Sequence, residues 1–308
     1  MPSDKDAGGW SAFLWNSERK EFLGRTGCSW CKIITFYIIF YGFLAGIFIG
    51  TIQALMLTLS ADKPTWQDRV EPPGLTHSPR LEKAEIVFTM HDLETYLTYI
   101  SSMRNFLEPY NVENQRDPWK YEDCGASPSA YKDRGDFDGD IGSRRACRFE
   151  QSILGPCSGI EDREFGFRDG KPCLIIKLNR IVHFYPRPPS NNEGIPEEAQ
   201  QKVQPNVMPV HCTSKREEDA DKIGEINYYG IGNGFPLQYY PYYGKILHPQ
   251  YLQPLVAVQF VNLTRNTELR VECRVFGDNI VHSETDRYQG RFDVKIHVID
   301  DAGEFRHF

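Results

Sequence analysis

Acidic side chains at close spacing are the most evident candidates for chemistry in this 308-residue sequence. The run DRGDFDGD (133–140) brings Asp136, Asp138 and Asp140 together, as a calcium-binding loop would. An EF-hand loop, however, needs Gly at its sixth place and Glu at its twelfth, where this chain has Ile141 and Cys147. We therefore interpret the run as a solvated acidic loop and predict no metal site.

Two short motifs overlap the same loop. Asp138 and Asp140 match the DxD element with which many Golgi glycosyltransferases hold a metal and a sugar nucleotide, although such a pair normally ends a hydrophobic strand, and here YKDRGDF precedes it. Arg134 to Asp136 spell RGD, a three-residue integrin-type match that chance alone explains. A type II Golgi glycosyltransferase and an adhesion receptor stay open as alternative functions.

Other catalytic signatures are missing from the sequence. It contains no GxSxG, HExxH or GxxxxGK[ST] motif, and GIGNGF (230–235) lacks the strand and helix that a dinucleotide loop requires. The histidines at 183, 211, 248 and 282 lack metal-ligand spacing. The net charge of -7 argues against nucleic acid as a partner. We predict a chain that is not an enzyme and has no cofactor.

A long uncharged run stands near the N-terminus. It extends from Ile33 to Ala61, longer than the roughly 20 residues that cross a bilayer, and is too long for a cleaved signal peptide. Basic residues are more numerous before it than after it, so the N-terminus should be cytosolic. We predict a cytosolic tail (1–32), a transmembrane signal-anchor helix (33–61) and an extracellular remainder in type II orientation.

The predicted span has two distinct faces. At about 100° per residue, Gly42, Gly46 and Gly50 form one stripe, and an aromatic stripe that begins with Tyr37 and Tyr41 lies nearly opposite. Small residues at every fourth position let another helix approach closely in lipid. An interfacial belt is the alternative for the tyrosines. The residues expected to bind a partner helix are Tyr37, Phe40, Tyr41, Gly42, Gly46 and Gly50.

The remaining sequence predicts a mainly-β domain. Proline-rich residues 62–80 read as an extended stalk, followed by a domain over 81–308 with a strand at 85–88 and a helix at 92–107. The helix should bury its apolar residues, among them Leu93 and Leu97, on one face. Beyond Cys173 apolar residues alternate with polar ones, as in ELRVECRVF and RFDVKIHVI. These patterns indicate half-buried antiparallel strands in a β-sandwich.

Cysteines and one sequon fit an oxidising compartment. Six cysteines lie beyond the span, an even number suited to disulfides, and 15 pairings are open. Cys28 and Cys31 lie on the cytosolic side and read as a membrane-proximal pair. Asn262 begins the single Asn-x-Ser/Thr site and should carry a glycan. In LQYYPYYGK (237–245), four tyrosines suit either a partner interface or packing inside the domain.

Two longer stretches resemble the β subunits of the Na,K-ATPase and H,K-ATPase family. WSAFLWN, followed six residues later by LGRTGCSW, resembles one family signature, and RRACRFEQSILGPCSG resembles another. YYPYYGK and DRVEPPGLT also look like family stretches, so the resemblance runs from end to end. Many members carry three or more sequons, and the single one here favours a sodium-pump over a gastric proton-pump β chain.

The resemblance implies a non-catalytic glycoprotein of the plasma membrane with an immunoglobulin-like sandwich. Its partner would be the α subunit of a P-type ATPase, whose folding and delivery it assists and whose potassium occlusion it tunes. A small FXYD-type subunit, membrane lipid and cholesterol are further expected partners. The implied disulfides are Cys124–Cys147, Cys157–Cys173 and Cys212–Cys273. Outside the membrane, the implied contacts are Gln67, Arg69, Val70, Pro72, Pro73, Gly74, Leu75, Thr76, Tyr239, Tyr240, Tyr242, Tyr243 and Lys245.

Overall fold

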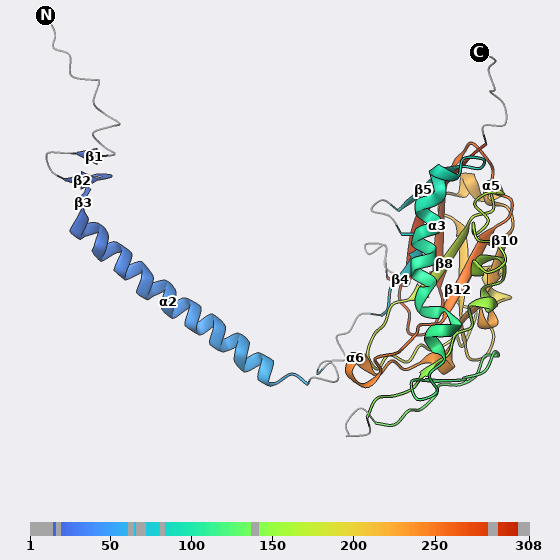
Figure 1. Ribbon diagram of the computed structural model, residues 1–308, viewed down its shortest axis with the longest axis horizontal. Coiled ribbons are helices and arrows are strands. Elements are labelled where there is room, and N and C mark those ends of the chain that lie inside the picture. Colours follow the sequence, from blue (N-terminus) through green and yellow to red (C-terminus); the bar gives the residue numbers. More distant parts are fainter. Residues whose placement is uncertain are drawn as a thin grey trace, which may run out of the picture. The chain divides into compact units, whose positions relative to one another are not determined.

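The computed structural model describes residues 15–16, 20–60, 65, 72–80, 84–136, 142–282 and 289–300. The chain forms two compact units, Met1–Ala61 and Asp62–Phe308. The first is dominated by one helix, and the second is rich in β-strands (Figure 1). Each unit is described by itself below.

Helix α2 (Gly27–Leu57) makes up most of the first unit. It is long and apolar enough to cross a membrane, and none of its residues is buried within the chain. It begins six residues before the uncharged run, because helical backbone continues through the polar residues ahead of Ile33. Before it lies a small sheet of three two-residue strands: β1 (Trp15–Asn16), β2 (Glu21–Phe22) and β3 (Arg25–Thr26).

Two main sheets build the second unit. One has the order β10 (Ile226–Tyr229), β12 (Leu255–Phe260), β8 (Cys173–Leu178) and β4 (Leu75–Ser78), with every pair antiparallel. The other has the order β11 (Gly234–Pro236), β9 (Val207–Ser214), β13 (Glu268–Val275), β14 (Arg291–Ile299) and β5 (Glu85–Thr89). Only β5 pairs in parallel within these two sheets, against β14.

The alternation of apolar and polar residues determines which face of each strand is buried. In β13 and β14 the apolar residues are buried, as the alternation predicts. Two acidic residues on the polar side are buried as well. Glu272 is held by Arg291 (2.9 Å) and Arg274 (2.5 Å), and Asp293 by Lys215 (3.3 Å). Buried carboxylates are tolerated when paired in this way.

Helix α3 (Leu93–Leu107) follows β5 directly. Asp92 caps it by accepting a hydrogen bond from the Glu94 backbone N–H (3.1 Å). Its buried face is formed by Tyr96, Tyr99, Ile100, Met103 and Leu107. The prediction that Leu93 and Leu97 are buried is wrong, since they are 46% and 49% exposed. Leu93 and Leu97 lie at the edge of the buried face of α3, and Tyr99 is buried there instead.

Loops and short helices fill the rest of the domain. The predicted stalk is too long, because residues 75–78 form edge strand β4 on β8. The remaining elements are η2 (Glu108–Tyr110), η3 (Val112–Gln115), β6 (Tyr121–Glu122), β7 (Ala146–Cys147), η4 (Gln151–Ser158), α4 (Glu197–Gln200), η5 (Glu217–Asp219), α5 (Ala220–Ile223), η6 (Ile231–Asn233), η7 (Leu237–Tyr239) and α6 (Gly244–Leu247).

Candidate interaction surfaces

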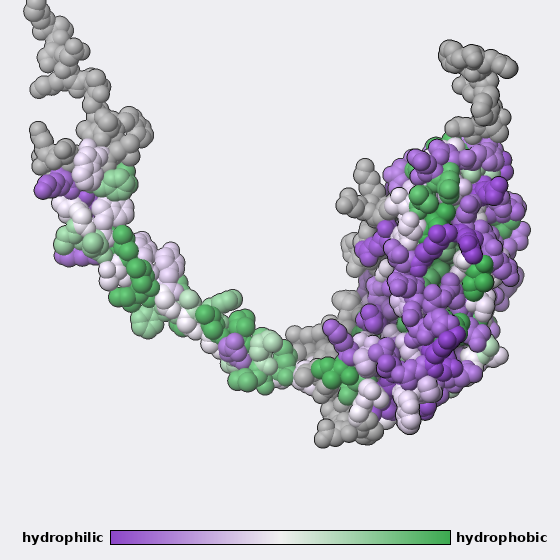
Figure 2. Space-filling view, viewed as in Figure 1, coloured by the Kyte–Doolittle hydropathy of each residue, from purple (hydrophilic) through white to green (hydrophobic). Residues whose placement is uncertain are grey.

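The exposed surface of α2 is the first candidate site. Tyr37 and Tyr41 stack one turn apart, with ring centroids 5.8 Å from each other, and are 48% and 60% exposed. Phe40 packs edge to face on Tyr41 at 5.4 Å. In Figure 2 this helix is largely green, whereas the visible face of the β-rich domain is mostly purple. The aromatic stripe is therefore preformed and uncovered.

The glycine stripe forms a shallow groove on α2. Ile39, Gly42, Phe43, Gly46 and Ile47 line a hollow of about 450 Å³. A methyl group built on any of the three stripe glycines would meet nothing within 4 Å, so the helix itself does not require Gly there. Since Gly in a helix interior costs roughly 1 kcal/mol relative to Ala, the stripe calls for a reason outside the helix.

The tyrosine segment presents a different picture. Tyr239, Tyr240, Tyr242 and Tyr243 are all buried, with 1%, 5%, 8% and 1% of their surface exposed. Tyr239 donates from its hydroxyl to the Arg148 carbonyl (2.6 Å). Burial raises the pKa of the Tyr239 and Tyr240 hydroxyls. These rings therefore pack inside the domain, one of the two arrangements that the segment suits, and leave Lys245 and Ile246 exposed. Contact of the segment with a partner stays a prediction.

The stalk side of the extracellular surface is only partly described. Leu75 is buried and pairs with Leu178, and Thr76 donates to the Asn179 side chain (2.5 Å). Gly74 forms an antiparallel bridge with Gln289. Pro72 and Gly74 are half-buried, whereas Pro73 is buried. The predicted contacts Gln67, Arg69 and Val70 lie outside the described residues, as do Asp138 and Asp140 of the acidic loop.

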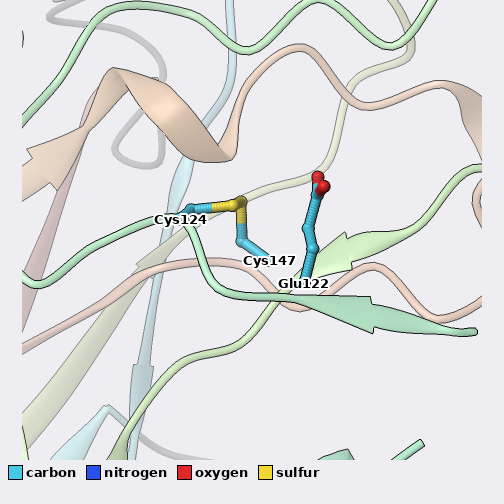
Figure 3. Close-up of side chains that lie close together, drawn as sticks. All are labelled: Glu122, Cys124 and Cys147. Atoms are coloured by element: carbon cyan, nitrogen blue, oxygen red, sulfur yellow. A yellow bond between two sulfur atoms is a disulfide. The ribbon is translucent and has the colours of Figure 1, made fainter. Parts of the chain in front are cut away.

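Glu122, Cys124 and Cys147 come together at β6 and β7, and they are the one group of possible metal ligands among the described residues (Figure 3). The two sulfurs are bonded to each other, which removes them as metal ligands. The Glu122 carboxylate is matched instead by Lys132 (3.0 Å) and Arg134 (3.1 Å). The cluster is therefore a disulfide supported by ion pairs.

The RGD sequence is built into the same cluster. The Arg134 side chain is 5% exposed and donates to the Arg145 carbonyl (2.9 Å) as well as to Glu122. An RGD ligand must offer its guanidinium freely, and this one is engaged within the domain. The structure agrees with the interpretation of RGD as a chance match.

All three disulfides have the pairing that the family resemblance implies. Cys124 is bonded to Cys147, Cys157 to Cys173, and Cys212 to Cys273. The last of these joins directly opposite residues of neighbouring strands β9 and β13 in one sheet. Cys28 and Cys31 are free and exposed. Asn262 is exposed just after β12, where a glycan finds room.

The structure also contains a buried lysine and a cleft that no sequence motif predicted. Lys202 lies 3.1 Å from the centroid of the Tyr228 ring and 3.1 Å from His211 Nδ1, and burial lowers its pKa to about 7. A cleft of about 880 Å³ is lined by Arg104, Arg116, Arg148 and Arg163. These residues come from separate segments, so no motif or spacing joins them.

Among the described residues, one exposed helix is long and apolar enough to cross a membrane. Together with the disulfide-linked β-rich domain, it defines the class of single-span membrane protein with a large folded domain. Comparison with known proteins gives the family. The family model described as "Sodium / potassium ATPase beta chain" matches residues 2–294. The chain belongs to this family.

Individual relatives support the assignment over nearly the whole length. Sodium/potassium-transporting ATPase subunit beta-233 of Anguilla anguilla is 66% identical over 97% of this chain and 100% of its own. Subunit beta-1 of Tetronarce californica is 54% identical over 96% and 98%. Human subunit beta-2 is 38% identical over 94% and 93%. The chain is a non-catalytic β chain of the plasma membrane in type II orientation, which replaces the glycosyltransferase alternative.

Proposed function

We propose that this chain assembles with the α subunit of a sodium/potassium-transporting ATPase through two surfaces, the faces of α2 and the stalk side of the β-rich domain. It assists the folding and plasma-membrane delivery of α and tunes potassium occlusion. The observation that carries the proposal is the uncovered α2, with its groove and aromatic stripe, in a chain that matches β subunits over nearly its full length.

The span contact follows from packing in lipid. Apolar surface gains nothing by leaving lipid tails for another apolar surface, so helices associate where close packing is possible. The groove over Gly42 and Gly46 allows such an approach, and the Tyr37–Tyr41 stack offers a rigid ridge on the other side. We assign the ridge to a transmembrane helix of α. The groove remains for a second helix, an FXYD-type subunit, or cholesterol and lipid.

Outside the membrane, contact with the α subunit must be made by residues that are exposed on the β-rich domain. By family resemblance, residues 67–76 and 239–245 contact the α subunit outside the membrane. Within the second segment the buried tyrosines shape the backbone, and Lys245 with Ile246 meets the partner. The tyrosines thus act through support rather than through contact.

For the domain itself we propose an immunoglobulin-like sandwich of irregular topology. Strand β4 of one sheet and β14 of the other are linked by the His77 and Phe292 rings, which stack at 4.6 Å. This contact supports face-to-face packing of the two sheets. Unlike a bond across a sandwich, Cys212–Cys273 lies within one sheet.

Co-purification tests the assembly proposal. The tagged chain is co-expressed with an α subunit, extracted in mild detergent, and the recovered α is quantified. Replacing Gly42, Gly46 and Gly50 together with Leu, or Tyr37 and Tyr41 with Leu, should lower recovery or change potassium occlusion. Ile38→Phe is the control, because it adds bulk to the exposed surface of the helix at a position that falls between the two stripes at about 100° per residue. Unchanged assembly and occlusion in both multiple variants would refute the role of α2.

A further inference from the structure

The cleft of about 880 Å³ in the domain lies apart from α2, the tyrosine segment and the stalk side. It lies between the C-terminal part of α3, the η2–η3 segment and the region around η4. We call it the arginine cleft, after Arg104, Arg116, Arg148 and Arg163 in its lining. Its floor includes Leu107, Phe149 and Phe165, which are 2%, 1% and 1% exposed.

The cleft is rigid because its walls are tied together. Gln115 is buried and donates from Nε2 to the Tyr110 carbonyl (2.6 Å) and the Phe149 carbonyl (3.0 Å), while its Oε1 accepts from the Phe149 N–H (2.8 Å). Gly159 has φ +72°, and a Cβ there would stand 2.6 Å from Phe165. Glycine is thus required for the floor to close, and the Cys157–Cys173 bond secures the adjoining η4.

Positive charge in the cleft exceeds what the cleft itself neutralises. Four arginines line it against two acidic residues, Glu108 and Glu150, in a chain whose net charge is -7. Arg116 is paired with Glu113. Among the described residues, Arg104 is bonded to the Arg163 carbonyl (3.1 Å) and Arg148 to the Arg116 carbonyl (3.5 Å), with no carboxylate on either. The structure shows no ion pair of Arg163 with another described residue.

We propose that the arginine cleft binds an acidic peptide segment with an aliphatic side chain, presented by a protein partner outside the membrane. Unpaired guanidinium groups recognise carboxylates with two parallel hydrogen bonds. The apolar floor, together with the exposed Val112 (63%) and Ile160 (58%) of the lining, accepts the aliphatic group. A surface that joins both features fits a peptide of mixed character.

The same lining argues against a sugar as the occupant. Sugar rings bind well on the exposed faces of aromatic side chains, and the aromatic residues of this cleft, Phe149 and Phe165, are buried edge and face in the floor. The polar lining combines four arginines and two glutamates with amide and hydroxyl side chains, so a neutral sugar would leave the guanidinium groups without an anionic partner. An acidic glycan is therefore the competing outcome that the experiment must separate.

The probe is a fluorescein-labelled hexapeptide of alternating Glu and Leu, titrated onto the purified complex of this chain with its α subunit and followed by anisotropy. We expect saturable binding that weakens roughly tenfold in Arg163→Glu and in Arg104→Glu, because each loses a charge-assisted contact and gains a repulsion. Raising the salt to about 1 M, where the Debye length is about 3 Å, should also weaken it.

Controls separate the cleft from general charge and from folding. Arg216→Glu makes the same change on an exposed arginine outside the cleft and should bind the probe normally. A Glu–Gly hexapeptide should bind more weakly, as should the original probe on Ile160→Ser. Recovery of the α complex reports on assembly separately, so loss of probe binding with intact assembly concerns the cleft alone.

Three results would overturn the proposal. They are the absence of saturable binding, equal binding by Arg163→Glu and Arg216→Glu, and tighter binding of a sulfated disaccharide than of the Glu–Leu peptide. The last would assign the cleft to glycans instead.

Discussion

Helix α2 and the β-rich domain differ in how much of their surface the chain itself buries. No residue of α2 is buried within the chain, whereas the domain buries a core and ties it with three disulfides. The domain is thus stabilised from within, and α2 depends on lipid and a partner helix for its contacts. The comparison teaches that stability and assembly are carried by different residues, so substitutions should separate them.

Loss of the in-sheet disulfide should have the largest effect on the domain. For a sequence separation of 61, the chain-entropy model assigns Cys212–Cys273 about 4 kcal/mol. We expect Cys212→Ser with Cys273→Ser to lower the free energy of unfolding by about that amount, measured by urea denaturation of the full chain in detergent. Cys28→Ser with Cys31→Ser is the control, since both thiols are free and exposed. Equal losses in the two double variants would contradict the division between the regions.

The same truncation in the two regions should give unequal results. Leu174 in β8 is fully buried, and Leu174→Ala should cost about 3 kcal/mol through the cavity it leaves. Leu44 in α2 is 48% exposed, and Leu44→Ala should leave the unfolding of the domain unchanged. Urea midpoints of both variants test this. A comparable shift for Leu44→Ala would show that the helix supports the domain fold.

Acid should act on the domain alone, with a smaller effect. Burial lowers the pKa of His77 to about 4, so the unfolded chain binds more protons than the folded one between about pH 4 and the usual value of 6.5. Stability should therefore fall as the pH drops through that window. Residues 33–57 contain no acid, base or histidine to add to it. Burial also lowers the pKa of His211, His248 and His282, so these residues share the profile. His77→Phe, which keeps a ring on Phe292, should make the slope in thermal melts less steep, and an unchanged slope would exclude His77.

Removal of the sequon should have the least effect. Asn262 is exposed, and its side chain takes part in no described core contact, so Asn262→Gln should change stability by less than about 0.5 kcal/mol. Gel mobility before and after glycosidase treatment shows whether a glycan is attached. A glycosidase shift that persists in Asn262→Gln would place the glycan elsewhere.

Sequence alone predicted those elements whose periodicity is local. Alternation in 268–275 and 291–299 indicated the strands, and the spacing of the apolar residues in 92–107 indicated α3. Sequence patterns did not predict burial where a segment distant in the sequence covers the residue. Tyr239 and its neighbours are buried because other loops cover them, and Glu272 is buried because two arginines approach it. The local periodicity of a sequence carries no information about such contacts between distant segments.

The predictions of interaction surfaces differ in the same way. The stripes of α2 can be read from a helical wheel, since one helix fixes their geometry. The arginine cleft requires residues 104, 148 and 163 to meet through the fold, and neither order nor spacing in the chain suggests it.

Strand order also bears on how the protein is made. Strand β14 lies between β13 and β5, so the earliest strand of that sheet has no neighbour until residues 291–299 have been synthesised. This sheet can therefore be completed only after β14 has reached the lumen, and β5 stays unpaired until then. A stop codon ahead of residue 291 would leave an open edge, which quality control could recognise and which neighbouring chains could pair with.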